Sequence, residues 1–270
     1  MSQNNPLSAI LDKQDFLLLD GAMATELEAR GCNLADSLWS AKVLVENPEL
    51  IREVHLDYYR AGAQCAITAS YQATPAGFAA RDLDEAQSKA LIGKSVELAR
   101  KAREAYLAEN PQAGTLLVAG SVGPYGAYLA DGSEYRGDYQ RSAEEFQAFH
   151  RPRVEALLDA GADLLACETL PNFAEISALA ELLTAYPRAR AWFSFTLRDS
   201  EHLSDGTPLR DVVALLADYP QVVALGINCI ALENTTAALQ HLHGLTALPL
   251  VVYPNSGEQY DAVSKTWHHH

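Results

Sequence analysis

The 270-residue sequence predicts an α/β fold of alternating parallel strands and helices, a TIM-type (β/α)8 barrel without its last helix–strand–helix. Short apolar runs alternate with helical segments from end to end, as in successive strand–helix units. The runs are continuous, as expected for parallel strands covered on both faces. Seven such strands are evident, whereas a closed barrel of this kind has eight. Since no repeat or low-complexity linker divides the sequence, residues 1–270 are predicted to form a single, C-terminally incomplete domain.

The boundaries of the first elements follow from local residues. Proline at a first turn and glycine after a last turn bracket a helix from Pro48 to Tyr59, which Gly62 closes. The segment 84–109, rich in Ala, Leu, Lys and Glu, is predicted to be helical and to end before Pro111. The predicted strands of this half are 16–19, expected to be short and buried, 64–68, and 115–124 with its glycine-rich exit; a long connection holding Trp39 and Ser40 follows the first.

The second half continues the alternation. Residues 125–139 are predicted to be a long polar loop with four tyrosines; loops of this length are often functional lids, and a passive excursion is the alternative. Ser142 and Glu145 have the spacing of a capping box, which begins a helix that ends near Gly161. The remaining predicted elements are strand 163–167, helix 173–185, strand 191–195, a turn and helix start at 205–208, strand 222–229, helix 233–243 and strand 248–253.

Composition excludes several classes of protein. With 49% hydrophobic residues the chain can bury a sizeable core, and its formal net charge of −15 argues against binding to nucleic acid or to an anionic membrane. The polar N-terminus has no signal-peptide core, and no apolar run reaches the roughly 18 residues of a membrane span. Because the four cysteines are scattered, we expect a cytoplasmic protein with reduced thiols, either a monomer or a small homo-oligomer.

Candidate functional residues lie where predicted strands end, because the C-terminal strand ends of an α/β barrel form the floor of its active site. Asp20 followed by Gly21 lets a ligand approach the backbone closely, or Asp20 simply caps the next helix. Glu168 is expected to face the pocket. Cys229 is a candidate nucleophile or metal ligand, or else a small buried hydrophobe. Three further cysteines are interpreted as structural: Cys32, Cys65 and Cys167.

Six stretches, each at a strand exit, together resemble the homocysteine S-methyltransferase family over essentially the whole chain. The resemblance is closest to the bacterial and plant enzymes that use S-methylmethionine or S-adenosylmethionine to methylate homocysteine to methionine. The stretches are Leu19-Asp20-Gly21-Ala22-Met23-Ala24-Thr25, Ile67-Thr68-Ala69-Ser70-Tyr71-Gln72, Ser121-Val122-Gly123-Pro124-Tyr125-Gly126-Ala127-Tyr128, Glu168-Thr169, Gly226-Ile227-Asn228-Cys229 and Tyr253-Pro254-Asn255-Ser256-Gly257.

The resemblance implies a barrel with a catalytic zinc ion (Zn2+) at its top. Cys229 matches the first zinc-ligating cysteine of the family, and the other two ligands, from a Gly-Gly-Cys-Cys motif, are expected beyond residue 270. The histidines 268–270 could bind metal or come from a purification tag. Because catalytic zinc normally takes three protein ligands, a chain that truly ended at His270 is expected to hold no stoichiometric catalytic zinc.

The resemblance also implies where the substrates bind. Asp20, with the backbone at Gly21 and Ala22, and Glu168 match positions that bind homocysteine in betaine-using relatives, which have glycine at position 22. Thr169 stands where those relatives carry an aromatic residue, and this departure argues against betaine as the donor. The donor side is expected to include Trp39, Tyr71, Gln72, Tyr125, Tyr128 and Asn228.

Two other functions remain open at this point. A metal-free barrel lyase or hydrolase would use Asp20 and Glu168 as an acid–base pair. A catalytically silent amino-acid-binding protein would bind substrate without turnover. Bound zinc together with homocysteine-dependent methyl transfer would distinguish the methyltransferase from both.

Overall fold

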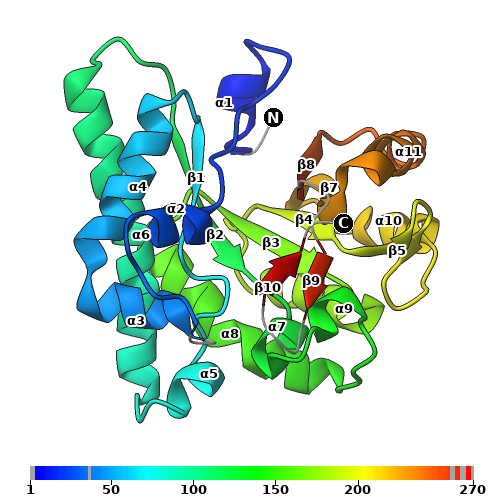
Figure 1. The fold of residues 1–270 in the computed structure, drawn as a ribbon. Helices are drawn as coiled ribbons and strands as arrows, with labels where there is room; N and C mark the ends of the chain where they lie inside the picture. The colour runs from blue at the N-terminus through cyan, green and yellow to red at the C-terminus, as the bar shows by residue number, and fades with distance from the viewer. Residues whose placement is uncertain (1–3, 36–37, 256–258, 262–265, 269–270) are drawn as a thin grey trace. The chain divides into compact units, whose positions relative to one another are not determined.

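The computed structural model describes residues 4–35, 38–255, 259–261 and 266–268 (Figure 1). Side chains are described for 4–35, 38–228 and 233–253. The chain forms two compact units: unit 1 is Met1–Val122 with Pro152–Leu165, and unit 2 is Gly123–Arg151 with Ala166–His270. That residues 1–270 form a single domain stays a prediction. None of the helices within the described ranges is long and apolar enough to cross a membrane.

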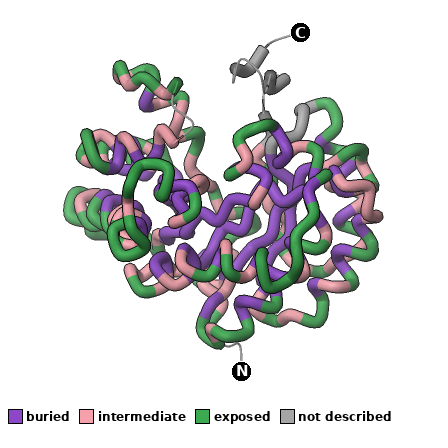
Figure 2. The backbone as a smooth tube through the Cα atoms, turned by 90° about the horizontal axis from the view of Figure 1, so that it is seen from below, coloured by how far each residue is buried: buried purple, intermediate pink, exposed green. Residues whose placement is uncertain are grey.

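Unit 1 contains two parallel strands, β1 (Cys65–Ile67) and β2 (Leu117–Val122), with Cys65 opposite Leu117. β2 is buried along its whole length (Figure 2). The predicted buried strand 16–19 is wrong in two respects. It makes a single bridge, from Leu19 to Cys65, and Phe16 and Leu18 are 68% and 47% exposed. Side chains alternate in extended backbone, so Phe16 and Leu18 share one face, which the described part of unit 1 leaves exposed.

The helices of unit 1 confirm most of the predicted boundaries. The Asp84 side chain accepts a hydrogen bond from the Gln87 N–H and the Gln87 side chain accepts one from the Asp84 N–H, so both unsatisfied donors at this helix start are used. Gly62 follows the Pro48 helix with φ +109°. The predicted long connection instead forms two helices, of which Trp39 begins the second. The helices are α1 (Ser8–Leu11), α2 (Met23–Ala29), α3 (Trp39–Glu46), α4 (Pro48–Arg60), α5 (Pro75–Ala79) and α6 (Glu85–Glu109).

Unit 2 is built on four strands in the order β3 (Leu164–Leu170), β4 (Ala191–Phe195), β7 (Val222–Ala231) and β8 (Leu250–Asn255). The first two residues of β3 belong to unit 1. β7 runs parallel to both β4 and β8. Gly226 permits the close approach to β8, since a Cβ atom there would come within 1.9 Å of the Val251 carbonyl oxygen. Six of the seven predicted strands are therefore confirmed, as β1, β2, β3, β4, β7 and β8.

Helix α8 (Ala143–Asp159) carries the chain from unit 2 into unit 1, and its predicted capping box is confirmed. The Glu145 N–H donates to Ser142 Oγ at 3.1 Å, and the Ser142 N–H donates to Glu145 Oε1 at 3.3 Å. The prediction that residues 125–139 form a loop is wrong, because this segment contains helix α7 and the 3₁₀ helix η1. The remaining elements of unit 2 are α7 (Tyr125–Leu129), η1 (Ser133–Tyr135), α9 (Phe173–Leu183), β5 (Leu197–Asp199), β6 (His202–Leu203), α10 (Leu209–Leu216), α11 (Leu232–His243), β9 (Gln259–Asp261) and β10 (Thr266–His268).

Candidate functional site

Glu168 is a buried carboxylate at the end of β3, 7% exposed. The Tyr253 hydroxyl, from β8, donates to its Oε2 at 2.5 Å, and Ser194 Oγ, from β4, lies 3.1 Å from the Tyr253 hydroxyl. Burial, and then the Glu168 charge, raise the pKa of Tyr253 well above its usual range. Tyr253 therefore stays protonated as a donor that fixes the position of the carboxylate.

Asn228, at the end of β7, connects the exits of β3 and β4. Its Oδ1 accepts from the Thr169 N–H at 2.9 Å and from Ser194 Oγ at 2.7 Å, and its Nδ2 donates to Thr169 Oγ1 at 2.6 Å. Thr169 has φ +61°, a left-handed conformation that a β-branched residue adopts only at a cost of about 1–3 kcal/mol. Strain of this kind persists where the surrounding contacts impose it and is concentrated at functional sites. We call Glu168, Thr169, Ser194, Asn228 and Tyr253 the strand-exit network.

Cys229 follows Asn228 on β7, as the sequence predicts. Its side chain lies outside the described residues, as do residues 256 and 257 of the last motif. Among the described residues, no group of three His, Cys, Asp or Glu side chains could hold a metal ion. The described residues therefore do not fit a complete zinc site, and the ligand role of Cys229 stays a prediction.

The other cysteines behave as predicted. Cys65 and Cys167 are fully buried, and Cys32 packs against the core of unit 1. Burial raises the pKa of the Cys65 thiol well above its usual range, so this thiol stays protonated and unreactive. All three are structural residues in this fold.

Asp20 in unit 1 does not cap a helix. The N-cap residue of α2 is Ala22, whereas Asp20 Oδ2 accepts from the Ile67 N–H at 3.0 Å at the end of β1. Gly21 lies against Tyr58, where a Cβ atom would come within 2.6 Å of the hydroxyl oxygen. Tyr58 donates to the Ala22 carbonyl at 3.0 Å. These contacts hold the backbone at residues 20–22 against the end of β1 and against α4.

The predicted site residues fall in both units. Trp39, on α3, packs against the core of unit 1, and the Tyr71 carbonyl accepts a hydrogen bond from Nη1 of the buried Arg153 at 2.7 Å. Gln72 is half-buried. That the unit 1 residues meet the unit 2 residues in one site stays a prediction; the first set is Asp20, Gly21, Ala22, Trp39, Tyr71 and Gln72, and the second is Glu168, Tyr125, Tyr128, Asn228 and Cys229.

Tyr125 belongs to an aromatic cluster with Tyr128, Tyr139, Phe146 and Phe149, whose ring centroids lie 5.0–6.0 Å from its own. The Arg141 guanidinium lies 5.3 Å from the Tyr125 centroid. A ring enclosed in this way has little face left for a sulfonium ion, whereas Tyr128 is 41% exposed. Of the two tyrosines, Tyr128 is therefore the more accessible, and a donor-side role for either stays a prediction.

Sequence reasoning missed a buried polar cluster around Glu175 on α9. The fully buried Glu175 accepts from the Tyr125 N–H at 2.6 Å and from the Tyr139 hydroxyl, and His150 Nε2 lies 2.6 Å from its Oε2. A charged residue among apolar ones in α9 was the only available signal. The cluster attaches the segment 125–139 to α8 and α9 and thus accounts for its regular structure.

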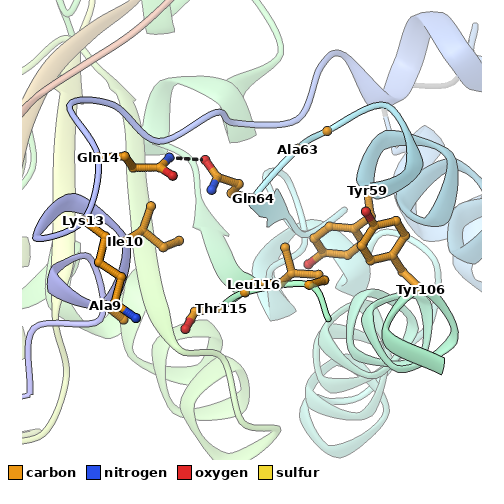
Figure 3. Close-up of a pocket in the computed structure, with 13 residues that line it drawn as sticks. Ala9, Ile10, Lys13, Gln14, Tyr59, Ala63, Gln64, Tyr106, Thr115 and Leu116 are labelled. Carbon is orange, nitrogen blue, oxygen red and sulfur yellow. Dashed lines mark hydrogen bonds between the residues drawn. The ribbon is translucent and has the colours of Figure 1, made fainter. Parts of the chain in front are cut away.

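A cavity of about 290 Å³ lies in unit 1, with an aromatic wall made by Tyr59 and Tyr106 (Figure 3). It is bordered by Gln64 and Leu116, which immediately precede β1 and β2. The cavity is therefore at the amino ends of these strands, whereas Asp20 is bound at the carboxyl end of β1. It is distinct from the predicted site.

Comparison with known proteins is consistent with this geometry. The sequence profile of the family described as homocysteine S-methyltransferase matches residues 17–270. The chain is 95% identical to the homocysteine S-methyltransferase of Escherichia coli (strain K12), over 100% of this chain and 87% of that protein. It is 54% identical to the homocysteine S-methyltransferase YbgG of Bacillus subtilis (strain 168), over 97% of this chain and 84% of that protein.

Among solved structures, the metallated form of the homocysteine methyltransferase MmuM from Escherichia coli superimposes with a TM-score of 0.93. The sequences are 95% identical, and the match covers 94% of this chain and 88% of that one. The prediction of an α/β fold of the TIM-barrel type, here with six parallel strands, is confirmed.

Proposed function

The chain belongs to the homocysteine S-methyltransferase family and is an enzyme of that activity, and from this premise we propose that its donor is a sulfonium compound, S-methylmethionine or S-adenosylmethionine. Thr169 supports this choice, because betaine-using relatives have an aromatic residue there. In the reaction, homocysteine sulfur forms a bond to the methyl carbon while the donor's carbon–sulfur bond breaks. The sulfonium becomes a neutral thioether and the acceptor becomes methionine.

We propose that the strand-exit network binds homocysteine through Glu168. Its carboxylate is complementary to the substrate ammonium, and Tyr253 holds one carboxylate oxygen at 2.5 Å. Asn228 holds the backbone at Thr169, next to Glu168, so the carboxylate is fixed before substrate arrives. This buried, hydrogen-bonded carboxylate on β3, which only β4 separates from the strand of Cys229, is the observation that best supports the proposal. Methyl transfer joins opposite charges, and a site poor in water favours such a step.

We further propose that the metal is zinc and that Cys229 is one of its ligands. A relative that is 95% identical exists in a metallated form, and zinc commonly binds cysteine thiolates. When bound, zinc would keep the acceptor thiol deprotonated. The described residues supply no set of three ligands, so any further ligands would come from outside them.

The proposed function is tested with donors carrying an isotopically labelled methyl group. With homocysteine present, labelled S-methylmethionine or S-adenosylmethionine is expected to give labelled methionine, and labelled betaine is not. Label transfer from betaine at a rate equal to that of the sulfonium donors would contradict the proposal, as would no transfer from either sulfonium. Omission of homocysteine is the control for hydrolysis of the donor.

A further inference from the structure

Glu134, in η1, has a buried carboxylate that forms no ion pair with any of the described residues. Glu134 is only 9% exposed, and its Oε2 has no hydrogen-bond partner among the described residues. We propose that Glu134 binds the α-ammonium group of the methyl donor, an inference that rests on the proposed function. Glu134 would thus determine specificity for amino-acid sulfonium compounds.

The backbone of Glu134 is held firmly in unit 2. Its carbonyl accepts from Thr196 Oγ1 at 2.8 Å, and Ser204 Oγ donates to Thr196 Oγ1 at 2.9 Å. On the other side lies Gly126, where a Cβ atom would come within 2.6 Å of the Glu134 nitrogen. The backbone position of Glu134 is therefore fixed by the packing of η1 against α7 and the end of β4.

Thr196 also relates Glu134 to the strand-exit network. It directly follows β4, and Ser194 of the network is two residues earlier on the same strand. A strand advances about 3.3 Å per residue, so the two anchoring points are roughly 7 Å apart along β4. An amino-acid donor is long enough to span this separation, with its ammonium at Glu134 and its sulfonium nearer the network.

The charged groups around Glu134 do not fully compensate its negative charge. The pKa of the Glu134 carboxyl is raised to about 7, chiefly by burial and to a smaller extent by the Asp131 charge, whereas its own backbone N–H and Arg136 act in the opposite direction. Arg136 donates to the Asp131 carbonyl at 2.9 Å and to Asp138 at 3.2 Å, so its hydrogen bonds go elsewhere. Tyr139, which packs close by, donates to Glu175. A ligand ammonium would supply the missing positive charge.

The chemistry favours the ammonium over the sulfonium as the group bound. The sulfonium loses its charge during methyl transfer, so a carboxylate placed on it would stabilise the ground state and slow the step. The ammonium keeps its charge throughout, and binding it lowers donor KM without this penalty. Donors that lack an ammonium, such as dimethylsulfoniopropionate, should be indifferent to Glu134.

The test compares Glu134→Gln with the unmodified enzyme, using S-methylmethionine and dimethylsulfoniopropionate as donors. Loss of one charge-assisted contact is expected to raise the KM for S-methylmethionine about tenfold to a hundredfold, and to leave the KM for homocysteine and for dimethylsulfoniopropionate unchanged. Glu144→Gln, which neutralises an exposed carboxylate in the first turn of α8, is the matched control and is expected to change the KM of neither donor.

The pH dependence gives a second readout. In the unmodified enzyme the KM for S-methylmethionine should fall as pH rises through 7, since Glu134 becomes charged, and this step should be lost in Glu134→Gln. An unchanged KM for S-methylmethionine in Glu134→Gln, or a rise confined to homocysteine, would overturn the inference while leaving methyl transfer intact. Failure of the unmodified enzyme with every sulfonium donor would instead overturn the proposed function.

Discussion

Replacing Asn228 with alanine should destabilise the protein strongly, because this side chain makes three hydrogen bonds in a buried environment. The substitution removes the acceptor for the Thr169 N–H and for Ser194 Oγ, which lie 2.9 and 2.7 Å from Asn228 Oδ1. Each buried donor left without an acceptor costs about 1–3 kcal/mol, which gives a loss of roughly 2–6 kcal/mol. Against a total stability of about 5–15 kcal/mol, this is a large fraction.

The strain at Thr169 makes the prediction more specific. In the Asn228→Ala background the Thr169 Oγ1 bond is already lost. Thr169→Gly then relieves the cost of φ +61° but also loses the burial of the Thr169 methyl group, and the net recovery should be about 1 kcal/mol. Urea unfolding followed by circular dichroism measures each free energy. Asn110→Ala, at an exposed helix end, is the control and should cost less than about 1 kcal/mol. A loss at Asn228 no larger than at Asn110, or no recovery by glycine, would refute the reasoning.

Three further outcomes are expected. Gly226→Ala should prevent the native pairing of β7 with β8, because its Cβ atom would lie 1.9 Å from the Val251 carbonyl oxygen; soluble yield and a thermal melt report the loss, and a melt like the parent's would contradict it. Glu134→Gln should match the parent in stability at pH 4 and exceed it by about 3 kcal/mol at pH 8. The reason is that the Glu134 pKa is raised from 4.5 in the unfolded chain to about 7 in the folded protein, so the parent loses stability as pH rises between these values. Equal urea midpoints of the two proteins at pH 8 would exclude this. Cys229→Ala should lower the zinc content measured by mass spectrometry, whereas Cys32→Ala should not.

Local signals predicted most of the fold. The capping boxes at Asp84 and Ser142 and the Pro48 helix start are short-range patterns, and all three are confirmed. The strand 16–19 was mispredicted because an apolar run does not show how its backbone pairs or which face is covered. The segment 125–139 was mispredicted because its polar composition conceals the contacts of Tyr125 and Tyr139 with Glu175.

The candidate site was predicted in part for the same reason. Glu168 and Asn228 were identified because strand exits are visible in the sequence. Their hydrogen bonds join residues 34–85 positions apart, and such contacts have no local signature. Glu134 was missed because its burial depends on Gly126 and Thr196, which come from other elements.

The central claim, that Glu168 binds the homocysteine ammonium, is tested most directly by the steady-state kinetics of Glu168→Gln. The account predicts that the KM for homocysteine rises about tenfold to a hundredfold, from the loss of a charge-assisted hydrogen bond of about 1.5–3 kcal/mol, whereas the KM for the donor changes much less. Glu181→Gln, at an exposed position of unit 2, should leave both unchanged. Equal losses for the two substrates in Glu168→Gln would contradict the claim.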